Sequence, residues 1–384
     1  MYKKINILHI SPTDIRYDGR ILKELNSLSK LSHFNLLAFG VEDNEGQIYE
    51  PDDDIDIKTF KLVTRKLNIF PRPIKYFINF IEAFLRMILP GIYSNPTIIH
   101  CHDTLFLPIA LMIKLFCKSK LIYDAHELES DKAGQSRVLS AYTLLIEKIS
   151  WKYIDLFISV SPSIINWYNE TLGVKESLLI LNAPQIDDKH VVTKNDYLRK
   201  RFNIPSNHKI FLYLGIICKK GRGIDYFLEA FKRDGVESHL VFIGYGDYVN
   251  EIKKLERIFL KIHYHEAVPY NKIVEISQSA DVGLCLIEAI SKSTYYSLPN
   301  KLFEYAFSNL HVLASNFPDM KRVVEKYNLG SCCSIDIDEI YTMIKIIEKM
   351  ETLVKNKNDK LYEISWPYQE KKLIENYQKL LKYK

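Results

Sequence analysis

The chain has 384 residues, more than one hydrophobic core usually serves, so two domains are expected. Its hydrophobic content of 47% and charged content of 26% are typical of a folded globular protein and exclude extended disorder. The net charge of +5 is modest, and no nucleic-acid-binding motif accompanies the basic residues, so nucleic acid is not an expected partner.

The cysteine pattern and the N-terminal segment favour a cytoplasmic protein. The six cysteines are scattered without CxxC spacing, and several lie in apolar runs, which is typical of reduced, packed thiols. The N-terminal residues MYKKINILHI lack a signal-peptide pattern and predict a first β-strand. No run of about 18 uninterrupted apolar residues occurs, so no membrane-spanning helix is expected.

In the first half of the chain, short apolar runs alternate with longer helical patterns. Strands are predicted near residues 4–10, 34–40, 97–101, 120–124, 155–160 and 178–181, and helices near residues 20–31, 105–117, 141–153 and 163–170. This alternation predicts a parallel sheet covered by helices.

The same alternation restarts in the second half. Strands are predicted at residues 210–215, 239–244, 282–287 and 311–315, after a polar stretch at residues 182–194. The fold class is therefore α/β, with two doubly wound domains and a hinge near residues 182–187. We expect domains at residues 1–185 and 186–365, followed by a Lys-rich amphipathic helix at residues 366–384.

A basic and apolar segment interrupts the first half. Residues 61–86 contain six basic side chains and one acid, Glu82, and the apolar residues within 74–89 recur mainly at helical spacing. One interpretation is an amphipathic helix that lies on an anionic membrane surface. The alternative is a helix that packs on the sheet and exposes a basic side.

Two polar clusters follow predicted strands of the first half, where parallel α/β sheets bind ligands. IIHCHD contains His100, His102 and Asp103, and IYDAHEL contains Asp124 and His126. A zinc site is not favoured, because His-x-His on a strand gives no closed ligand set and no HExxH motif supports it. We expect these side chains to bind a polar substrate in a cleft between the domains, without a metal.

Known nucleotide motifs are absent from the sequence. The first strand is followed by SPTDIRYDGR rather than GxGxxG, and no Walker GxxxxGK[ST] motif occurs, so NAD, FAD and P-loop sites are disfavoured. The segment FIGYGD contains only a bare GxG at Gly244 and Gly246.

Two segments of the second half suit a diphosphate. In YLGIICKKGRGID, a strand ends at Gly215, and Lys219, Lys220 and Arg222 surround glycines that lead into a helix. A solvated loop of charges is the alternative interpretation.

The other segment is SLPNKLFEY, residues 297–305. Pro299 predicts a helix start, whose N–H groups and positive dipole end attract phosphate beside Lys301. Glu304, three residues later, suits the hydroxyls of a ribose. An ordinary helix with one solvated Lys and one solvated Glu is the alternative.

Six segments in order, YDAHEL, LILNAP, LGIICKKGRGIDYFLEAF, FIGYGD, ADVGL and SLPNKLFEYAFSNLHVLAS, resemble the family 4 glycosyltransferases. These are retaining, nucleotide-sugar-dependent enzymes of the GT-B fold, of the type that acts in bacterial surface polysaccharide synthesis. The likeness spans nearly the whole chain and includes the C-terminal segment SWPYQEKKLIENY, which in this family returns to the N-terminal domain.

The resemblance implies roles for single residues. The catalytic group would be His126 against the transferred sugar, Arg222 and Lys301 at the diphosphate, and Glu304 at the ribose. Donor-binding residues would be Gly215, Lys219, Lys220, Gly244, Gly246, Ala267, Val268, Pro269, Ser297, Pro299, Asn300 and Leu302, the segment from Ala267 to Pro269 pairing with the base. Acceptor-binding residues would be Gly19, Arg20, His102 and Asp103.

The sequence also departs from the family. A second glutamate, eight residues before the ribose-binding one, is Tyr296 here, the Gly-x-Pro after the helix is Asn309, Leu310 and His311, and the glycine pair of the first loop is absent. A nucleotide-sugar 2-epimerase of the same fold and a non-catalytic GT-B partner subunit therefore remain alternatives.

The resemblance implies a hexosyltransferase reaction. A hexose or N-acetylhexosamine would pass from a nucleotide diphosphate sugar, UDP-linked in our expectation, to a glycan or lipid-linked acceptor, with no cofactor and no metal. The fixed charges of a helix N-terminus, Lys301 and Arg222 would stabilise the leaving diphosphate. We expect the protein to be cytoplasmic, at the inner face of the cell membrane.

Overall fold

The computed structural model describes residues 4–43, 54–66, 69, 71–186, 193–269, 272–353 and 359–382. The chain divides into two compact units. Unit 1 comprises Met1–Ile180 with Glu370–Lys384, and unit 2 comprises Leu181–Gln369. The expected hinge at residues 182–187 begins at this boundary, and its last residue lies outside the described residues.

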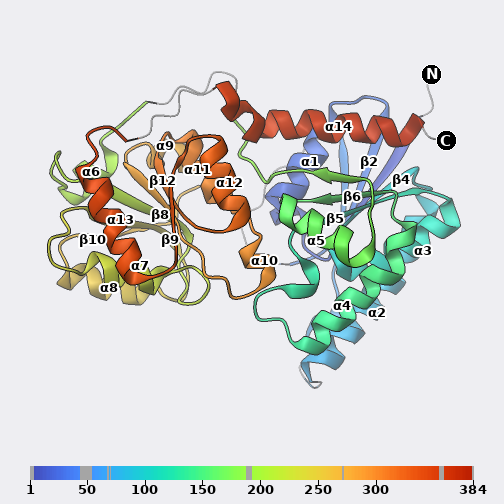
Figure 1. The fold of residues 1–384 in the computed structure, drawn as a ribbon. Coiled ribbons are helices and arrows are strands. Elements are labelled where there is room, and N and C mark those ends of the chain that lie inside the picture. The colour runs from blue at the N-terminus through green and yellow to red at the C-terminus, as the bar shows by residue number, and fades with distance from the viewer. Residues whose placement is uncertain are drawn as a thin grey trace. The chain divides into compact units, whose positions relative to one another are not determined.

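Unit 1 is built on a seven-stranded parallel sheet with the order β3-β2-β1-β4-β5-β6-β7 (Figure 1). The strands are β1 (Ile5–Ile10), β2 (Phe34–Val41), β3 (Ile55–Phe60), β4 (Ile98–His102), β5 (Lys120–Ala125), β6 (Leu156–Ser159) and β7 (Ser177–Leu179). Its α-helices are α1 (Gly19–Ser29), α2 (Arg72–Tyr93), α3 (Leu107–Cys117), α4 (Arg137–Ser150) and α5 (Pro162–Leu172).

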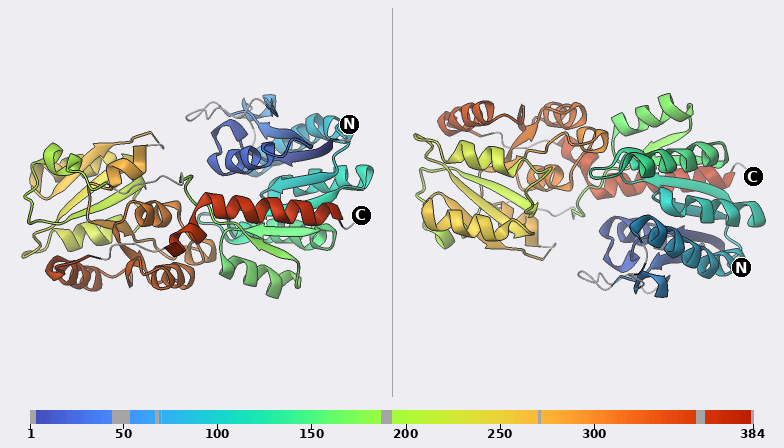
Figure 2. Two further views of the ribbon diagram at one scale, coloured as in Figure 1. Left: turned by 90° about the horizontal axis from the view of Figure 1, so that it is seen from above. Right: turned by 90° about the horizontal axis from the view of Figure 1, so that it is seen from below.

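Unit 2 has a six-stranded parallel sheet with the order β10-β9-β8-β11-β12-β13. The strands are β8 (Ile210–Ile216), β9 (His239–Tyr245), β10 (Ile262–Glu266), β11 (Val282–Cys285), β12 (His311–Ser315) and β13 (Gly330–Cys333). In each unit, helices cover both faces of the sheet (Figure 2).

The helices of unit 2 lie between these strands and after them. They are α6 (Tyr197–Phe202), α7 (Ile224–Phe231), α8 (Val249–Ile258), α9 (Ile273–Ser277), α10 (Lys292–Tyr295), α11 (Asn300–Phe307), α12 (Pro318–Lys326) and α13 (Ile337–Lys349). The last helix, α14 (Trp366–Lys382), begins in unit 2 and ends in unit 1. Within unit 1, Glu370 pairs with Lys30, and Lys379 pairs with Glu176.

The predicted α/β class with two doubly wound units is confirmed, and each predicted strand is present to within a few residues. Three further strands, β3, β10 and β13, were not predicted. The strand β10 reads IHYHE and β13 reads GSCC, so neither contains the continuous aliphatic run that indicates a buried strand. Both strands pair in parallel with a longer strand, β10 with β9 and β13 with β12, and this pairing satisfies their backbone hydrogen-bonding groups.

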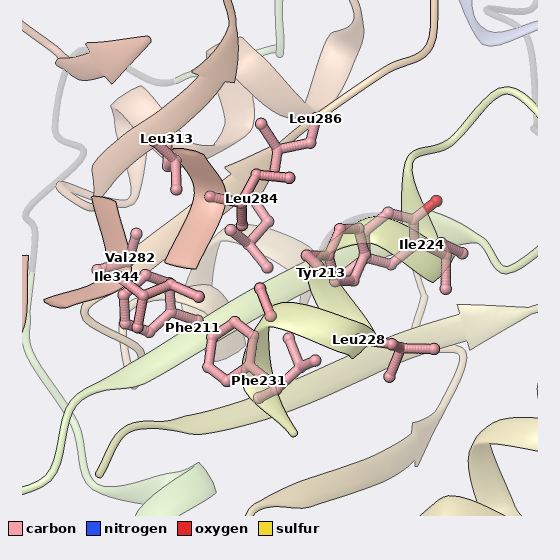
Figure 3. Packing of buried hydrophobic residues seen from close by; sticks show 14 of the residues in the cluster. Phe211, Tyr213, Ile224, Leu228, Phe231, Val282, Leu284, Leu286, Leu313 and Ile344 are labelled. Carbon is pink, nitrogen blue, oxygen red and sulfur yellow. The ribbon is translucent and has the colours of Figure 1, made fainter. Parts of the chain in front are cut away.

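The core of unit 2 lies between its sheet and the helices α7 and α13. Phe211 and Tyr213 of β8 contact residues from α7, β11, β12 and α13, all of them buried (Figure 3). Leu228 and Phe231 contribute from α7, and Ile344 contributes from α13. This packing holds β8 and β11 rigidly as neighbours.

Tyr305 fastens α11 to the opposite side of these two strands. Its hydroxyl accepts a hydrogen bond from the Leu214 N–H (2.9 Å) and donates to the Leu212 carbonyl (3.1 Å). Its ring lies against Gly283 of β11, where an added Cβ would come within 2.3 Å of the ring. The start of α11 is therefore set by contacts with β8 and β11.

Tyr305→Phe should destabilise the protein, because the Leu214 N–H would be buried without its partner. We expect the free energy of unfolding to fall by about 1–3 kcal/mol. Urea denaturation followed by circular dichroism measures this change. Tyr295→Phe, at a partly exposed tyrosine of α10, is the control and should have no effect. Equal stability of Tyr305→Phe and wild type would contradict the role of this hydroxyl.

Candidate functional site

The candidate donor site of unit 2 lies where the strand order reverses. Strands β8 and β11 are neighbours in the sheet, although β9 and β10 separate them in the chain. In doubly wound sheets, ligands bind outside the carboxyl ends of the strands at this point. Here these ends are Ile216 and Cys285, which lead into residues 217–223 and 286–291.

Glu288 holds the glycine loop that follows β8. Its Oε1 accepts hydrogen bonds from the backbone N–H groups of Gly221 (2.9 Å) and Gly223 (3.1 Å). Both glycines have positive φ, 79° and 64°, so a side chain there would be strained. Around this fixed loop, Lys219 and Lys220 are exposed and Arg222 is half-buried.

Glu288 was not predicted as a site residue. It lies 65 and 67 positions from the two glycines that it binds, and no motif connects them. The only signal in the sequence was its place soon after the apolar run that forms β11, where ligand-binding residues are expected.

The predicted helix start at Pro299 is confirmed. Helix α11 begins at Asn300, and Pro299 is its N-cap residue, with no hydrogen bond from a capping side chain to the first turn. The Leu302 N–H bonds to the Pro299 carbonyl (3.0 Å). Helix N-termini bind phosphate in other proteins, but here a phosphate would compete with this bond for the Leu302 N–H, whose donor role stays a prediction.

Lys301 is buried, and its side chain turns towards β8. Its Nζ lies 3.8 Å from the centre of the Tyr213 ring and 4.0 Å from the position that a Cβ at Gly215 would occupy. Among the described residues, no carboxylate forms a salt bridge with this ammonium group, although the charge of Glu304 acts on it from one helical turn away. The Tyr213 ring supplies a cation–π contact but no compensating negative charge.

This environment weakens the charge of Lys301. Burial lowers the pKa of Lys301 to about 8, and the guanidinium of Arg222 acts in the same direction. Glu304, one helical turn later, is also buried. The structure thus brings Lys301, Arg222 and Glu304 into mutual electrostatic range, and their contact with one nucleotide-sugar stays a prediction.

At three positions of the predicted donor site, the local backbone structure explains why the residue is glycine. Gly215, Gly244 and Gly246 adopt φ of 113°, 155° and 148°. A Cβ at Gly244 would lie 1.9 Å from the Gly215 carbonyl oxygen, and one at Gly246 would lie 2.2 Å from that of Ile217. Close packing of β8 and β9 therefore requires Gly244 and Gly246, and their donor role stays a prediction.

The other predicted donor residues lie at the same edge of the sheet. Ala267, Val268 and Pro269 follow β10 directly, and Ser297 precedes α11. Ala267 and Pro269 are exposed at the end of this strand. Their contact with a nucleotide base stays a prediction.

Unit 1 contains a buried polar network at its own reversal point, between β1 and β4. His9 of β1 and both His100 and His102 of β4 are fully buried, with ring centres 4.3–5.2 Å apart. Asp124 and His126 follow from β5. Sequence reasoning named the β4 and β5 residues but missed His9 and Tyr377.

Hydrogen bonds connect these rings in a chain. His126 Nε2 lies 3.1 Å from His102 Nδ1, His102 Nε2 lies 3.0 Å from His9 Nδ1, and His9 Nε2 lies 3.2 Å from the hydroxyl of Tyr377. That hydroxyl lies 2.6 Å from His100 Nδ1. A single direction of donation, from His126 towards His100, satisfies every one of these bonds.

Arg20 is the buried cation of this network. Its guanidinium donates to both carboxylate oxygens of Asp124 (3.0–3.3 Å) and to the Ile180 carbonyl (3.0 Å), and it lies 3.3 Å from Glu24. This arrangement gives Arg20 a structural role in unit 1, and the acceptor contacts expected of Gly19, Arg20 and His102 stay predictions.

His126 is the least buried member of the network. Burial opposes its charge, but the carboxylates of Asp124 and Asp103 outweigh that effect and raise the pKa of His126 to about 10. Asp103 lies 4.0 Å from its Nδ1 and has a positive φ of 58°, which is uncommon outside glycine. His126 is thus a charged hydrogen-bond donor at neutral pH rather than a general base.

The same side chains also have the composition of a metal site. In two groups, His9–Glu24–His100–His102 and His102–Asp124–His126, one ligand-type atom of each residue lies within 4.8 Å of the others. However, both ring nitrogens of His9 and of His102 are already hydrogen-bonded, and Arg20 lies beside Glu24. A cation would break these bonds and face a guanidinium, so the network fits a metal poorly.

Comparisons with known proteins find similar sequences and folds. Residues 194–364, most of unit 2, match the family described as glycosyl transferases group 1. The chain is 24% identical over 363 residues to the chitobiosyldiphosphodolichol beta-mannosyltransferase of Kluyveromyces lactis, covering 84% of this chain and 78% of that protein.

Solved structures resemble the whole chain at low sequence identity. Sucrose-phosphate synthase from Thermosynechococcus elongatus superposes with a TM-score of 0.75 at 15% identity, covering 99% of this chain and 100% of that one. Anabaena HepE in complex with UDP and glucose gives a TM-score of 0.73 at 12% identity, covering 97% and 99%. These likenesses and the two parallel-sheet units show the predicted GT-B fold.

The charge of His126 can be tested by NMR of histidine-labelled protein. With its pKa raised to about 10, His126 should stay an imidazolium from pH 6 to 8.5, and His126→Gln identifies its signal. Asp103→Asn removes one of the two carboxylates and should move the titration towards neutral pH. Titration of wild-type His126 near pH 6.5 would contradict the assigned charge.

Proposed function

We propose that this glycosyltransferase of the GT-B type moves a hexose or N-acetylhexosamine from a UDP-linked sugar to a glycan or lipid-linked acceptor. The reaction proceeds with retention at the anomeric carbon, without a metal ion, in surface polysaccharide synthesis. The observation that carries the proposal is the buried ammonium of Lys301 beside the N-terminus of α11, which forms no salt bridge within the described residues.

An unpaired buried charge is unfavourable unless a ligand compensates it. The diphosphate of a nucleotide-sugar supplies two negative charges and many acceptor oxygens. Lys301, Arg222 and the N–H groups at the start of α11 surround the carboxyl ends of β8 and β11, where such a ligand would bind. Glu304 then accepts hydrogen bonds from the ribose hydroxyls.

The proposed step breaks the bond between the anomeric carbon and the diphosphate oxygen. Negative charge grows on the diphosphate, and the fixed positive groups stabilise it as it develops. The acceptor hydroxyl attacks the same face of the sugar, and its proton passes to the departing diphosphate oxygen. This scheme needs no metal, and removal of one stabilising donor typically raises the barrier by about 2.7–4 kcal/mol.

The acceptor is the less defined substrate. The Kluyveromyces lactis relative is named for a mannosyl transfer to a lipid-linked chitobiose, which supports a lipid-linked glycan acceptor here. We assign this acceptor to unit 1, with Gly19 and Asp103 among its contacts and His126 against the transferred sugar, and we assign the reaction to the cytoplasm.

An assay with labelled UDP-sugars, with and without a lipid-linked acceptor, separates the candidate functions. Transfer to the acceptor supports the proposal, and a glycosidic product of unchanged anomeric configuration supports retention. Release of an epimerised sugar without acceptor would indicate a 2-epimerase instead. Donor binding with no turnover on any acceptor would indicate a non-catalytic subunit, which the Tyr296 substitution would explain.

Lys301→Ala and Glu304→Ala should each abolish transfer while the protein stays folded. The first removes the buried cation at the diphosphate, and the second removes the acceptor of the ribose hydroxyls. Initial rates measure transfer, and the melting temperature measures folding. Lys292→Ala, at an exposed lysine of α10, is the control and should keep the wild-type rate. Near-normal turnover of either site variant would exclude that residue from the site.

The affinity for UDP should fall as the pH rises through 8. The free protein loses the Lys301 charge above a pKa of about 8, whereas bound diphosphate favours the charged form. Affinity should therefore be fully present below pH 8 and about tenfold lower at pH 9 than at pH 7.

Isothermal titration calorimetry measures this dependence. Lys301→Met should bind UDP weakly at pH 7 and lose this pH dependence, which separates Lys301 from titration of the uracil base. The same tenfold loss in Lys301→Met as in the wild type would show that another group titrates.

A further inference from the structure

Three helices of unit 1 form a continuous surface, here called the three-helix surface. Helix α3 packs against α2 on one side and against α4 on the other. Figure 1 shows the three helices gathered on one side of this unit. Each helix exposes large apolar side chains, which a water-facing helix of a globular protein normally does not concentrate.

Apart from Tyr76 and Tyr93, the exposed large apolar residues of α2 form one stripe. They occur at i, i+3, i+7, i+11 and i+15, which places them on one face of the helix, and each is at least 40% exposed: Ile74, Phe77, Ile81, Leu85 and Leu89. The stripe therefore extends over nearly the whole length of α2.

The other two helices continue this pattern. On α4, Val138, Tyr142, Leu145 and Ile149 occur at i, i+4, i+7 and i+11, and all are exposed. On α3, Met112, Leu115 and Phe116 are exposed on one side. The three stripes together make an apolar area much larger than isolated surface residues would.

The opposite face of α2 belongs to the core of unit 1. Ala83 and Met87 are fully buried, and Gly91 packs so closely that an added Cβ would lie 2.4 Å from Ile113. The segment Ile74–Tyr93 is long and apolar enough to cross a membrane by length and composition, and 17% of its most apolar 18-residue window is buried. Its contacts with the core instead favour a helix that packs along unit 1 and exposes its apolar stripe.

The charges beside the stripes have one sign. Arg137 and Lys148 on α4 are exposed, and Lys118 follows α3 directly, whereas the exposed Arg86 on α2 is paired with Glu82. These positions lie about a quarter turn or more from the stripes, as expected for cations at the rim of an apolar face.

No carboxylate is exposed on the described parts of these three helices. Glu82 of α2 is turned inward, where it accepts hydrogen bonds from the N–H groups of Val63 and Thr64. Glu147 of α4 is fully buried among the hydroxyls of Tyr123 and Tyr168. Glu147 thus leaves the surface of α4 entirely, and Glu82 is mostly buried and paired with Arg86.

We propose that the three-helix surface docks unit 1 on an anionic lipid bilayer, with the apolar stripes in the interface and the rim cations at the lipid headgroups. Anionic headgroups complement these cations. A two-fold pairing with a second copy would instead bring the cationic rims of both copies together. Unit 1 would thus bind lipid through this surface, a function separate from the proposed sugar transfer.

Vesicle co-sedimentation of the full chain tests this docking. We expect strong binding to vesicles of phosphatidylcholine and phosphatidylglycerol at a ratio of about 70:30, and weak binding to vesicles of phosphatidylcholine alone. High salt should weaken the binding to the anionic vesicles. Phe77→Ser/Leu85→Ser should raise the lipid concentration needed for half-binding by at least about tenfold, since it removes two interfacial side chains. Arg137→Gln/Lys148→Gln should lose only the preference for anionic lipid.

The control variant is Ile258→Ser/Leu260→Ser, which changes two exposed apolar residues of unit 2 and should bind lipid like the wild type. UDP binding of every variant, unchanged from wild type, shows that the donor site is intact. The proposal is overturned if the wild-type protein does not bind anionic vesicles. It is also overturned if the unit 2 control loses as much lipid binding as Phe77→Ser/Leu85→Ser. It is also overturned if Phe77→Ser/Leu85→Ser dissociates a dimer without changing lipid binding.

Discussion

A single buried ammonium group constrains the candidate site of unit 2. The Lys301 side chain is buried over the Tyr213 ring, with no carboxylate partner among the described residues, and burial holds its pKa near 8. Protein interiors rarely leave a charge in this state without a functional reason. The surrounding structure maintains it: Tyr305 ties α11 to β8, Gly283 makes room for the Tyr305 ring, and the packed core behind β8 and β11 resists displacement.

The same arrangement explains how a metal-free transfer would work. The charge on a departing diphosphate needs compensation at fixed positions, and a helix N-terminus with an adjacent lysine is rigid before the substrate arrives. Glu288 has a supporting part, because it fixes the backbone of the glycine loop from which Arg222 projects. Each of these groups is fixed by neighbours within unit 2.

Sequence reasoning succeeded where a local pattern reports a local structure. The start of α11 at Asn300 followed from Pro299, and the strands with long aliphatic runs were all found. It failed where contacts join distant parts of the chain. Glu288 binds glycines more than sixty positions away, and Tyr377 of α14 hydrogen-bonds His9 across 368 positions. His9 itself had no signal, because one histidine inside an apolar strand has no spacing to interpret.

The basic, apolar segment near residue 80 allowed two interpretations, a packed helix or a membrane-surface helix. Helix α2 packs through Ala83 and Met87 in the core and exposes its apolar stripe, so its contact with a membrane stays a proposal. The additional stripes on α3 and α4 were invisible in sequence, because only the fold brings the three helices together.

A crystal structure of the protein with a bound UDP-sugar tests the central claim most directly. The account predicts diphosphate oxygens within hydrogen-bond distance of Lys301 Nζ and of the first N–H groups of α11, with the ribose at Glu304. A nucleotide bound elsewhere, or an α11 N-terminus covered by protein while the donor is bound, would contradict it.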